Sequence, residues 1–90
     1  SDQQLDEIKS QYGVVVANII DGVLIKLKKD LIKSVKLGGH LFLTGILQER
    51  DNLFFDKFIE ASPELKVIRR IQKDEWVGYW VQKIEPVIED

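Results

Sequence analysis

The stretch YGVVVANI, residues 12–19, decides how this 90-residue sequence is expected to fold. It is apolar and β-branched without alternation, which is typical of a short strand buried on both faces, as in a parallel sheet. The preceding residues, 1–11, are polar and form a lead-in with weak helical spacing. We therefore expect the domain to start with a parallel strand at residue 12.

Patterns of a helix and of a second strand come next. Residues 22–36 place apolar side chains at helical spacing with lysines opposite, and Asp21 can cap that helix. The pair Gly38-Gly39 predicts the end of the helix. Residues 40–44 are again short and apolar, so they predict a second buried strand.

The rest of the sequence predicts a second helix and a hairpin. An amphipathic pattern over about 49–61 stops before Pro63, which terminates a helix. Residues 65–72 and 75–84 are strand-like, with a turn at residues 73–74 between them. A turn this short joins antiparallel strands.

The predicted order is strand, helix, strand, helix, strand, strand, in an α/β domain over residues 12–85 with an acidic tail at 86–90. Two successive right-handed crossovers that advance the same way place both helices on one face of the sheet. The other face stays apolar and bare, which a lone domain seldom tolerates. We therefore expect the chain to be part of something larger or to associate.

Composition argues against several classes of function. There is no cysteine and only one histidine, so neither a disulfide nor a metal site is expected. With 13 basic and 15 acidic residues, the net charge of −2 argues against DNA binding. The lysines within 26–36 form either a solvated helix face or a patch for an anionic partner. No stretch is apolar enough to span a membrane and no signal-peptide pattern opens the sequence, so we expect a cytoplasmic protein.

Four short motifs carry a resemblance to a known family. In chain order they are Val-Ala-Asn-Ile (16–19), Gly-Gly (38–39), Thr-Gly-Ile-Leu (44–47) and Asp-Glu-Trp-Val (74–77). Each motif is weak alone, but in this order they resemble the ribosomal protein L11 methyltransferases, a family within the class I methyltransferase fold. The resemblance covers roughly residues 12–84, and it departs from the family at Leu37, where the family has proline.

The resemblance implies a fold and an activity. The chain would be the C-terminal half of a Rossmann-like class I methyltransferase sheet, supplying strands four to seven with the last one antiparallel. The intact parent would transfer a methyl group from S-adenosylmethionine to amino groups of a ribosomal protein. The glycine-rich loop after the first strand and the acidic residue that binds the ribose are both missing here. This chain alone is therefore expected to bind no cofactor and to be inactive.

The resemblance also implies a site at the ends of the first two strands. Asn18 ends a buried parallel strand, where open α/β sheets bind ligands, and it is the candidate catalytic residue that orients the amine. The alternative is an amide that caps the next helix. Ala17 and Ile19 would flank the cofactor passively. Thr44 and Gly45 would lie beside Asn18 and either line the cofactor pocket or form a plain turn.

Other polar and aromatic residues are expected to be structural. His40 should open a strand at the opposite end of the sheet and take no part in catalysis. Trp76 should pack under the last helix rather than bind substrate. The acidic residues Asp30, Glu49 and Asp51 are expected to be solvated or helix-start charges, so no carboxylate pair is available for acid–base catalysis.

A second hypothesis places the chain in another class, a stand-alone or engineered module that dimerises through the bare sheet. In that case Val14–Ala17 is an edge strand whose backbone pairs with another chain. A homodimer is the expected state of this chain, whereas a ribosomal protein is the substrate of the intact parent. A complete small enzyme is disfavoured because no catalytic constellation is visible.

Overall fold

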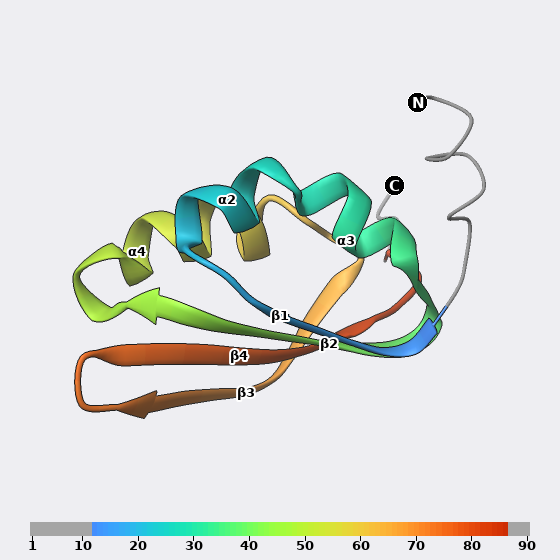
Figure 1. Cartoon of the computed structure of the whole chain (residues 1–90). Helices are drawn as coiled ribbons and strands as arrows, with labels where there is room; N and C mark the ends of the chain where they lie inside the picture. Colours follow the sequence, from blue (N-terminus) through green and yellow to red (C-terminus); the bar gives the residue numbers. More distant parts are fainter. Residues whose placement is uncertain (1–11, 87–90) are drawn as a thin grey trace.

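A computed structural model describes residues 12–86, which form one mixed four-stranded sheet with helices (Figure 1). The strands are β1 (Tyr12–Asn18), β2 (Val35–Leu47), β3 (Leu65–Lys73) and β4 (Trp76–Lys83). They lie in the order β1-β2-β4-β3, with β1 parallel to β2 and β4 antiparallel to both of its neighbours. The α/β fold and the antiparallel last strand are thus confirmed. The predicted lead-in, and residues 87–90 of the predicted tail, lie outside the described residues.

The connections between the parallel strands are short helices. They are α2 (Asp21–Lys26), α3 (Lys28–Ser34), η1 (Gln48–Arg50), α4 (Asp51–Phe54) and η2 (Phe55–Glu60). Instead of the single helix predicted over 22–36, the first crossover has two helices that meet at Leu27. In the part of the chain that the structure describes, no helix is long and apolar enough to cross a membrane.

Helix α3 ends earlier than the sequence predicts, and polar contacts explain where. The hydroxyl of Ser34 donates to the carbonyl of Leu31 at 2.7 Å, a local bond that competes with continuation of the helix. The Lys83 ammonium donates to the carbonyls of Ile32 and Val35, both at 2.9 Å. A cation at this end satisfies free carbonyls and interacts favourably with the helix dipole.

The prediction that Gly38-Gly39 ends a helix is wrong, because both glycines lie inside β2. Gly38 has a φ of 84°, which favours glycine. A Cβ on Gly39 would lie 2.9 Å from the carbonyl oxygen of Gly13. The absence of side chains therefore lets β1 and β2 approach each other at a point where their register also shifts.

The C-terminal hairpin is confirmed, with its turn displaced by one residue. Lys73 pairs with Trp76, so the turn consists of Asp74 and Glu75 rather than residues 73–74. Asp74 has a φ of 56°, and a positive φ at the first central position is the backbone requirement of a tight two-residue hairpin loop.

Both helical crossovers cover the same face of the sheet, as the two right-handed crossovers predict (Figure 1). The core lies between this face and the helices. Its fully enclosed side chains include Phe54 and Phe58 from the helices and Leu41, Leu43 and Val81 from the strands. The rings of Phe54 and Phe58 stack with centroids 5.0 Å apart.

The opposite face of the sheet is open. On β1, the edge strand, Tyr12, Val14 and Val16 are 64%, 59% and 67% exposed, so burial on both faces, predicted from the run of valines, is not found. Phe42 alternates with the buried Leu41 and Leu43 and therefore points to the open face, where it stacks on Trp80 at 5.4 Å.

Two residues expected elsewhere belong to the strands near this open face. Trp76 is 49% exposed at the start of β4 and is not packed under a helix, which corrects the prediction. His40 lies within β2 rather than at its start, because the strand begins at Val35. The Nδ1 atom of His40 accepts a 3.0 Å hydrogen bond from the Trp80 indole.

Candidate functional site

Asn18 is the last residue of β1 and pairs in register with Thr44 of β2. Both residues lie where parallel strands end, the edge at which open α/β sheets bind ligands. Asn18 is exposed, and within residues 12–86 its side-chain amide has no hydrogen-bond partner. The N-cap of α2 is Ile20, with no side-chain cap bond, so Asn18 does not cap this helix. Its donors and acceptor are therefore available to a ligand.

Gly45 fixes the distance between the ends of the two strands. Its φ of 90° is one that side chains rarely adopt. A Cβ at this position would lie 3.0 Å from Oδ1 of Asn18 and 3.1 Å from the carbonyl oxygen of Ile19. The structure therefore brings Asn18, Thr44 and Gly45 together. Glycine is needed at position 45 for the β2 backbone to lie against Asn18.

The remaining predicted site residues differ in their surroundings. Ala17 is buried in the core that the helices cover, whereas Ile19 is half-buried and packs against that core. Thr44 lines a shallow, largely apolar hollow of about 190 Å³ that also includes Phe42, Trp76 and Trp80. Ala17 thus packs β1 against the core, whereas Thr44 lies at the strand ends and also borders the hollow on the open face.

Asp21 lies next to this edge and forms a partly buried ion pair. It begins α2, and instead of capping the helix, as predicted, its carboxylate accepts a 2.9 Å hydrogen bond from Nε of Arg50. The Asp21 side chain is only 6% exposed, whereas that of Arg50 is 47% exposed. A buried carboxylate at a helix N-terminus with an arginine partner is electrostatically compensated.

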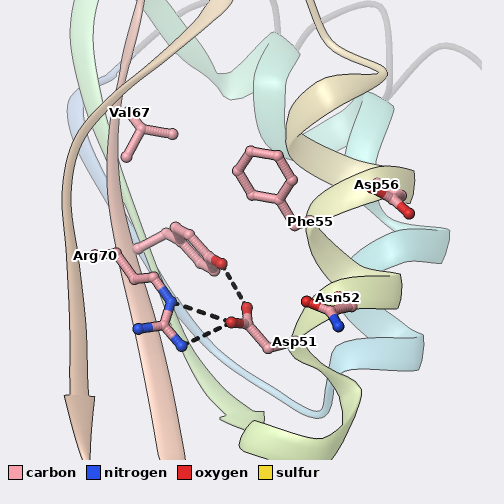
Figure 2. Close-up of a pocket in the computed structure, with 7 residues that line it drawn as sticks. Asp51, Asn52, Phe55, Asp56, Val67 and Arg70 are labelled. Carbon is pink, nitrogen blue, oxygen red and sulfur yellow. Dashed lines mark hydrogen bonds and ion pairs between the residues drawn. The ribbon is translucent and has the colours of Figure 1, made fainter.

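A second network lies at the start of α4, around Asp51 (Figure 2). Arg70 donates to Oδ2 of Asp51 from Nε at 3.1 Å and from Nη2 at 2.7 Å, and the Tyr79 hydroxyl donates to Oδ1. Asn52 and Phe55 also line the groove of about 650 Å³ in which these side chains meet. Asp51 is a helix-start charge, one of the two predicted possibilities, because it lies in the first turn of α4. Its carboxylate is bound by Arg70 and Tyr79 and is not simply solvated.

The network shifts two pKa values. Burial of the phenol and its hydrogen bond to Asp51 raise the pKa of Tyr79 to about 12, against the lowering effect of Arg70. The hydrogen bond to Asp51 also raises the pKa of the Arg70 guanidinium. At neutral pH, Tyr79 and Arg70 therefore keep the protons that they donate to Asp51.

The sequence predicts neither ion pair. The partners are 29 positions apart for Asp21 and Arg50, and 19 apart for Asp51 and Arg70. Charges at such separations leave no periodic pattern in one sequence. Over residues 12–86, no group of three or more potential ligands could hold a metal ion.

Comparison with known families gives a match over nearly the whole chain. The family described as Ribosomal protein L11 methyltransferase (PrmA) matches residues 1–84. A ribosomal protein L11 methyltransferase of Campylobacter concisus is 35% identical over 78 residues, which are 87% of this chain and 27% of that protein. The corresponding protein of Campylobacter lari is 40% identical over 73 residues, 81% of this chain and 25% of that protein. The chain thus spans about a quarter of the length of these relatives.

A solved structure has the same fold. The crystal structure of a ribosomal protein L11 methylase from Lactobacillus delbrueckii subsp. bulgaricus superposes with a TM-score of 0.75 at 17% sequence identity. The superposition covers 90% of this chain and 41% of that one. The four strands and their helices therefore correspond to part of a larger methylase fold.

Proposed function

This chain belongs to the ribosomal protein L11 methyltransferase family, and from that membership we propose that its residues form the C-terminal part of an S-adenosylmethionine-dependent enzyme. The complete protein methylates amino groups of ribosomal protein L11. It works in the cytoplasm, where its substrate is made. The 90 residues alone neither bind the cofactor nor catalyse transfer, because they contain no glycine-rich cofactor loop.

The observation that carries this proposal is the free amide of Asn18 at the ligand-binding edge of the sheet. S-adenosylmethionine supplies a methyl group that is already activated, so the protein has mainly to align a neutral amine with it. The Oδ1 atom of Asn18 can accept a hydrogen bond from the amine and leave the nitrogen lone pair pointing at the methyl carbon. Gly45 keeps Asn18 in place, and Thr44 and Ile19 border the same edge.

The test is Asn18→Ala in the complete protein. Loss of a preorganised hydrogen bond at a reacting group removes about 2–4 kcal/mol of transition-state stabilisation, so we expect kcat to fall strongly. The dissociation constant for S-adenosylmethionine, measured by calorimetry, should change little. Asn52→Ala is the matched control, because Asn52 is also an exposed amide but lines the groove around Asp51, away from the strand ends. Wild-type turnover of the Asn18 variant would exclude Asn18 from the reaction.

One observation favours a second function for the chain by itself, a dimerisation module. Its edge strand β1 and open sheet face expose Tyr12, Val14 and Val16 together. A free strand edge pairs readily with another chain, and apolar surface on both copies favours association. A twofold dimer is the commonest closed arrangement, so we propose that the 90-residue chain forms a homodimer through this edge or face.

Sedimentation equilibrium at micromolar concentration tests the dimer. We expect a mass near twice the 10.4 kDa of one chain. Val16→Lys places a charge at the exposed edge and should yield the monomer. Val23→Lys, on the exposed side of α2, is the control and should leave the dimer intact. A folded wild-type chain that stays monomeric as its concentration rises would contradict the proposal.

A further inference from the structure

We infer that Asp21 and Arg50 are positioning residues that hold the end of β2 against the end of β1 and so fix the Asn18 amide. We call this ion pair the strand-end clasp. The inference rests on the proposed function of Asn18 and adds to it two residues that do not touch the substrate. Three observations support it: the position of the ion pair beside the strand ends, the burial of the Asp21 carboxylate, and the contacts that hold the segment around Arg50.

The clasp connects the segments that follow β1 and β2, two strands that already touch at Gly45. Asp21 starts α2 directly after the loop that follows Asn18, and Arg50 ends η1, which follows β2. Gly45 packs against Asn18 and Ile19, as the positions around its missing Cβ show. The Arg50–Asp21 bond of 2.9 Å is a second connection, beyond the strand ends. Two separate contacts prevent the end of β1 from pivoting on the end of β2.

Loss of the ion pair is unfavourable because the Asp21 carboxylate is buried. The side chain is 6% exposed, and Arg50 is its only ion-pair partner among residues 12–86. Removing one member of a buried pair leaves an uncompensated charge, which is strongly unfavourable. Without Arg50, the start of α2 would have to move until water reached Asp21. Asn18 is joined to that segment by only two residues, Ile19 and Ile20, so it would move with it.

The other side of the clasp is anchored to the C-terminal hairpin. Asp51, the neighbour of Arg50, is held by Arg70 of β3 and Tyr79 of β4. The amide of Gln48 donates to the carbonyl of Glu75 in the hairpin turn at 2.8 Å. Arg50 therefore projects from a segment fixed on both sides. In contrast, β1 is an edge strand with one neighbour. The clasp therefore connects β1, which carries Asn18 and has little support of its own, to a segment that the hairpin holds in place.

The experiment compares Asp21→Asn and Arg50→Gln in the complete protein with two matched controls. Asp30→Asn and Arg69→Gln make the same changes at exposed positions away from the strand ends. One measurement is kcat for methylation of ribosomal protein L11, together with the KM for S-adenosylmethionine. The other is the NMR signal of the Asn18 side-chain amide, which needs no activity. Arg50→Lys keeps the charge but not the planar donor and tests whether geometry matters.

We expect both clasp variants to lower kcat by roughly tenfold to hundredfold with an unchanged KM, because a displacement of about 1 Å costs on the order of 100-fold. The Asn18 amide signals should shift in both variants and stay in place in both controls. Arg50→Lys should recover part of the rate.

Three results would overturn the inference. They are wild-type kcat in Arg50→Gln, unshifted Asn18 signals in both clasp variants, and a rate loss without any shift, which would indicate direct contact with substrate. If the wild-type protein transfers no methyl group, the proposed function fails, whereas the NMR signals still decide whether the clasp positions Asn18.

Discussion

Gly45 shows how a single residue without a side chain can determine the geometry of a site. Its backbone has a φ of 90°, and an added Cβ would lie 3.0 Å from the Asn18 oxygen. The position therefore excludes side chains both by conformation and by space.

We predict that Gly45→Ala lowers the free energy of unfolding of this chain by about 1–3 kcal/mol, since strained backbone and overpacking each contribute on that scale. Urea denaturation followed by circular dichroism measures the change. Gly22→Ala is the control, because nothing lies within 4 Å of its missing Cβ. In the helix, that change should be neutral or stabilising. Equal stability of the Gly45 variant and the wild type would show that the β2 end is freer than its contacts indicate.

A second prediction at the residue scale concerns Tyr79. Its pKa is raised to about 12, so the folded state retains the phenol proton more strongly than the unfolded state does. Stability from this group is therefore complete below about pH 10 and is lost as pH rises toward about 12. At neutral pH, Tyr79→Phe should be less stable by about 1–3 kcal/mol, because Asp51 loses a donor.

The difference in unfolding free energy between wild type and Tyr79→Phe should shrink as pH rises above about 10. Comparing the two proteins cancels the titration of the lysines, which both contain. A difference that stays constant with pH would mean that the Tyr79 proton is not coupled to folding.

At the scale of elements, the hairpin turn offers a direct test. Asp74 has a φ of 56° in a two-residue turn, a conformation that glycine adopts without steric strain. We expect Asp74→Gly to raise the free energy of unfolding by about 0.5–1 kcal/mol, measured from the midpoint of urea denaturation. The same substitution at Asp30 in helix α3 should lower it by a similar amount. A loss of stability at position 74 would indicate that the Asp74 side chain has an unrecognised role in the turn.

The elements also show what the sequence can predict. The sequence predicts strand β1 from its valines and the hairpin around Asp74, because strand patterns and short turns are local signals. The glycine pair at 38–39 leads to a wrong prediction because two glycines are equally typical of a helix end and of closely approaching strands. Whether Val14 and Val16 are covered depends on what packs on the open face, and a run of valines does not specify that.

The site was predictable only where it follows from topology. Asn18 and Thr44 meet because parallel strands end at one edge, which the strand order implies. The pairing of Asp21 with Arg50, by contrast, depends on where two loops converge in space. Asp51 lies at a helix start, which the sequence allows, but its partners Arg70 and Tyr79 come from distant strands and cannot be predicted from local pattern.

For the whole molecule, we predict that this 90-residue chain does not measurably bind S-adenosylmethionine. In related folds a glycine-rich loop and a ribose-binding acid make most cofactor contacts, and this sequence has neither in the corresponding arrangement. Calorimetric titration, with a full-length relative as positive control, tests this. Saturable binding in the micromolar range would show that the carboxyl ends of β1 and β2 form a cofactor site on their own.

The strand order β1-β2-β4-β3 also has a consequence for synthesis on the ribosome. Among residues 12–86, β3 pairs only with β4, yet β4 is made after it. At roughly 5–20 residues per second, β3 emerges about a second before β4 does and is unpartnered for that time. Of the four described strands, the last to emerge is the one that joins β3 to the rest of the sheet. Nearly all of the described sequence must therefore leave the ribosome before β3 is protected from chaperones, proteases and neighbouring nascent chains.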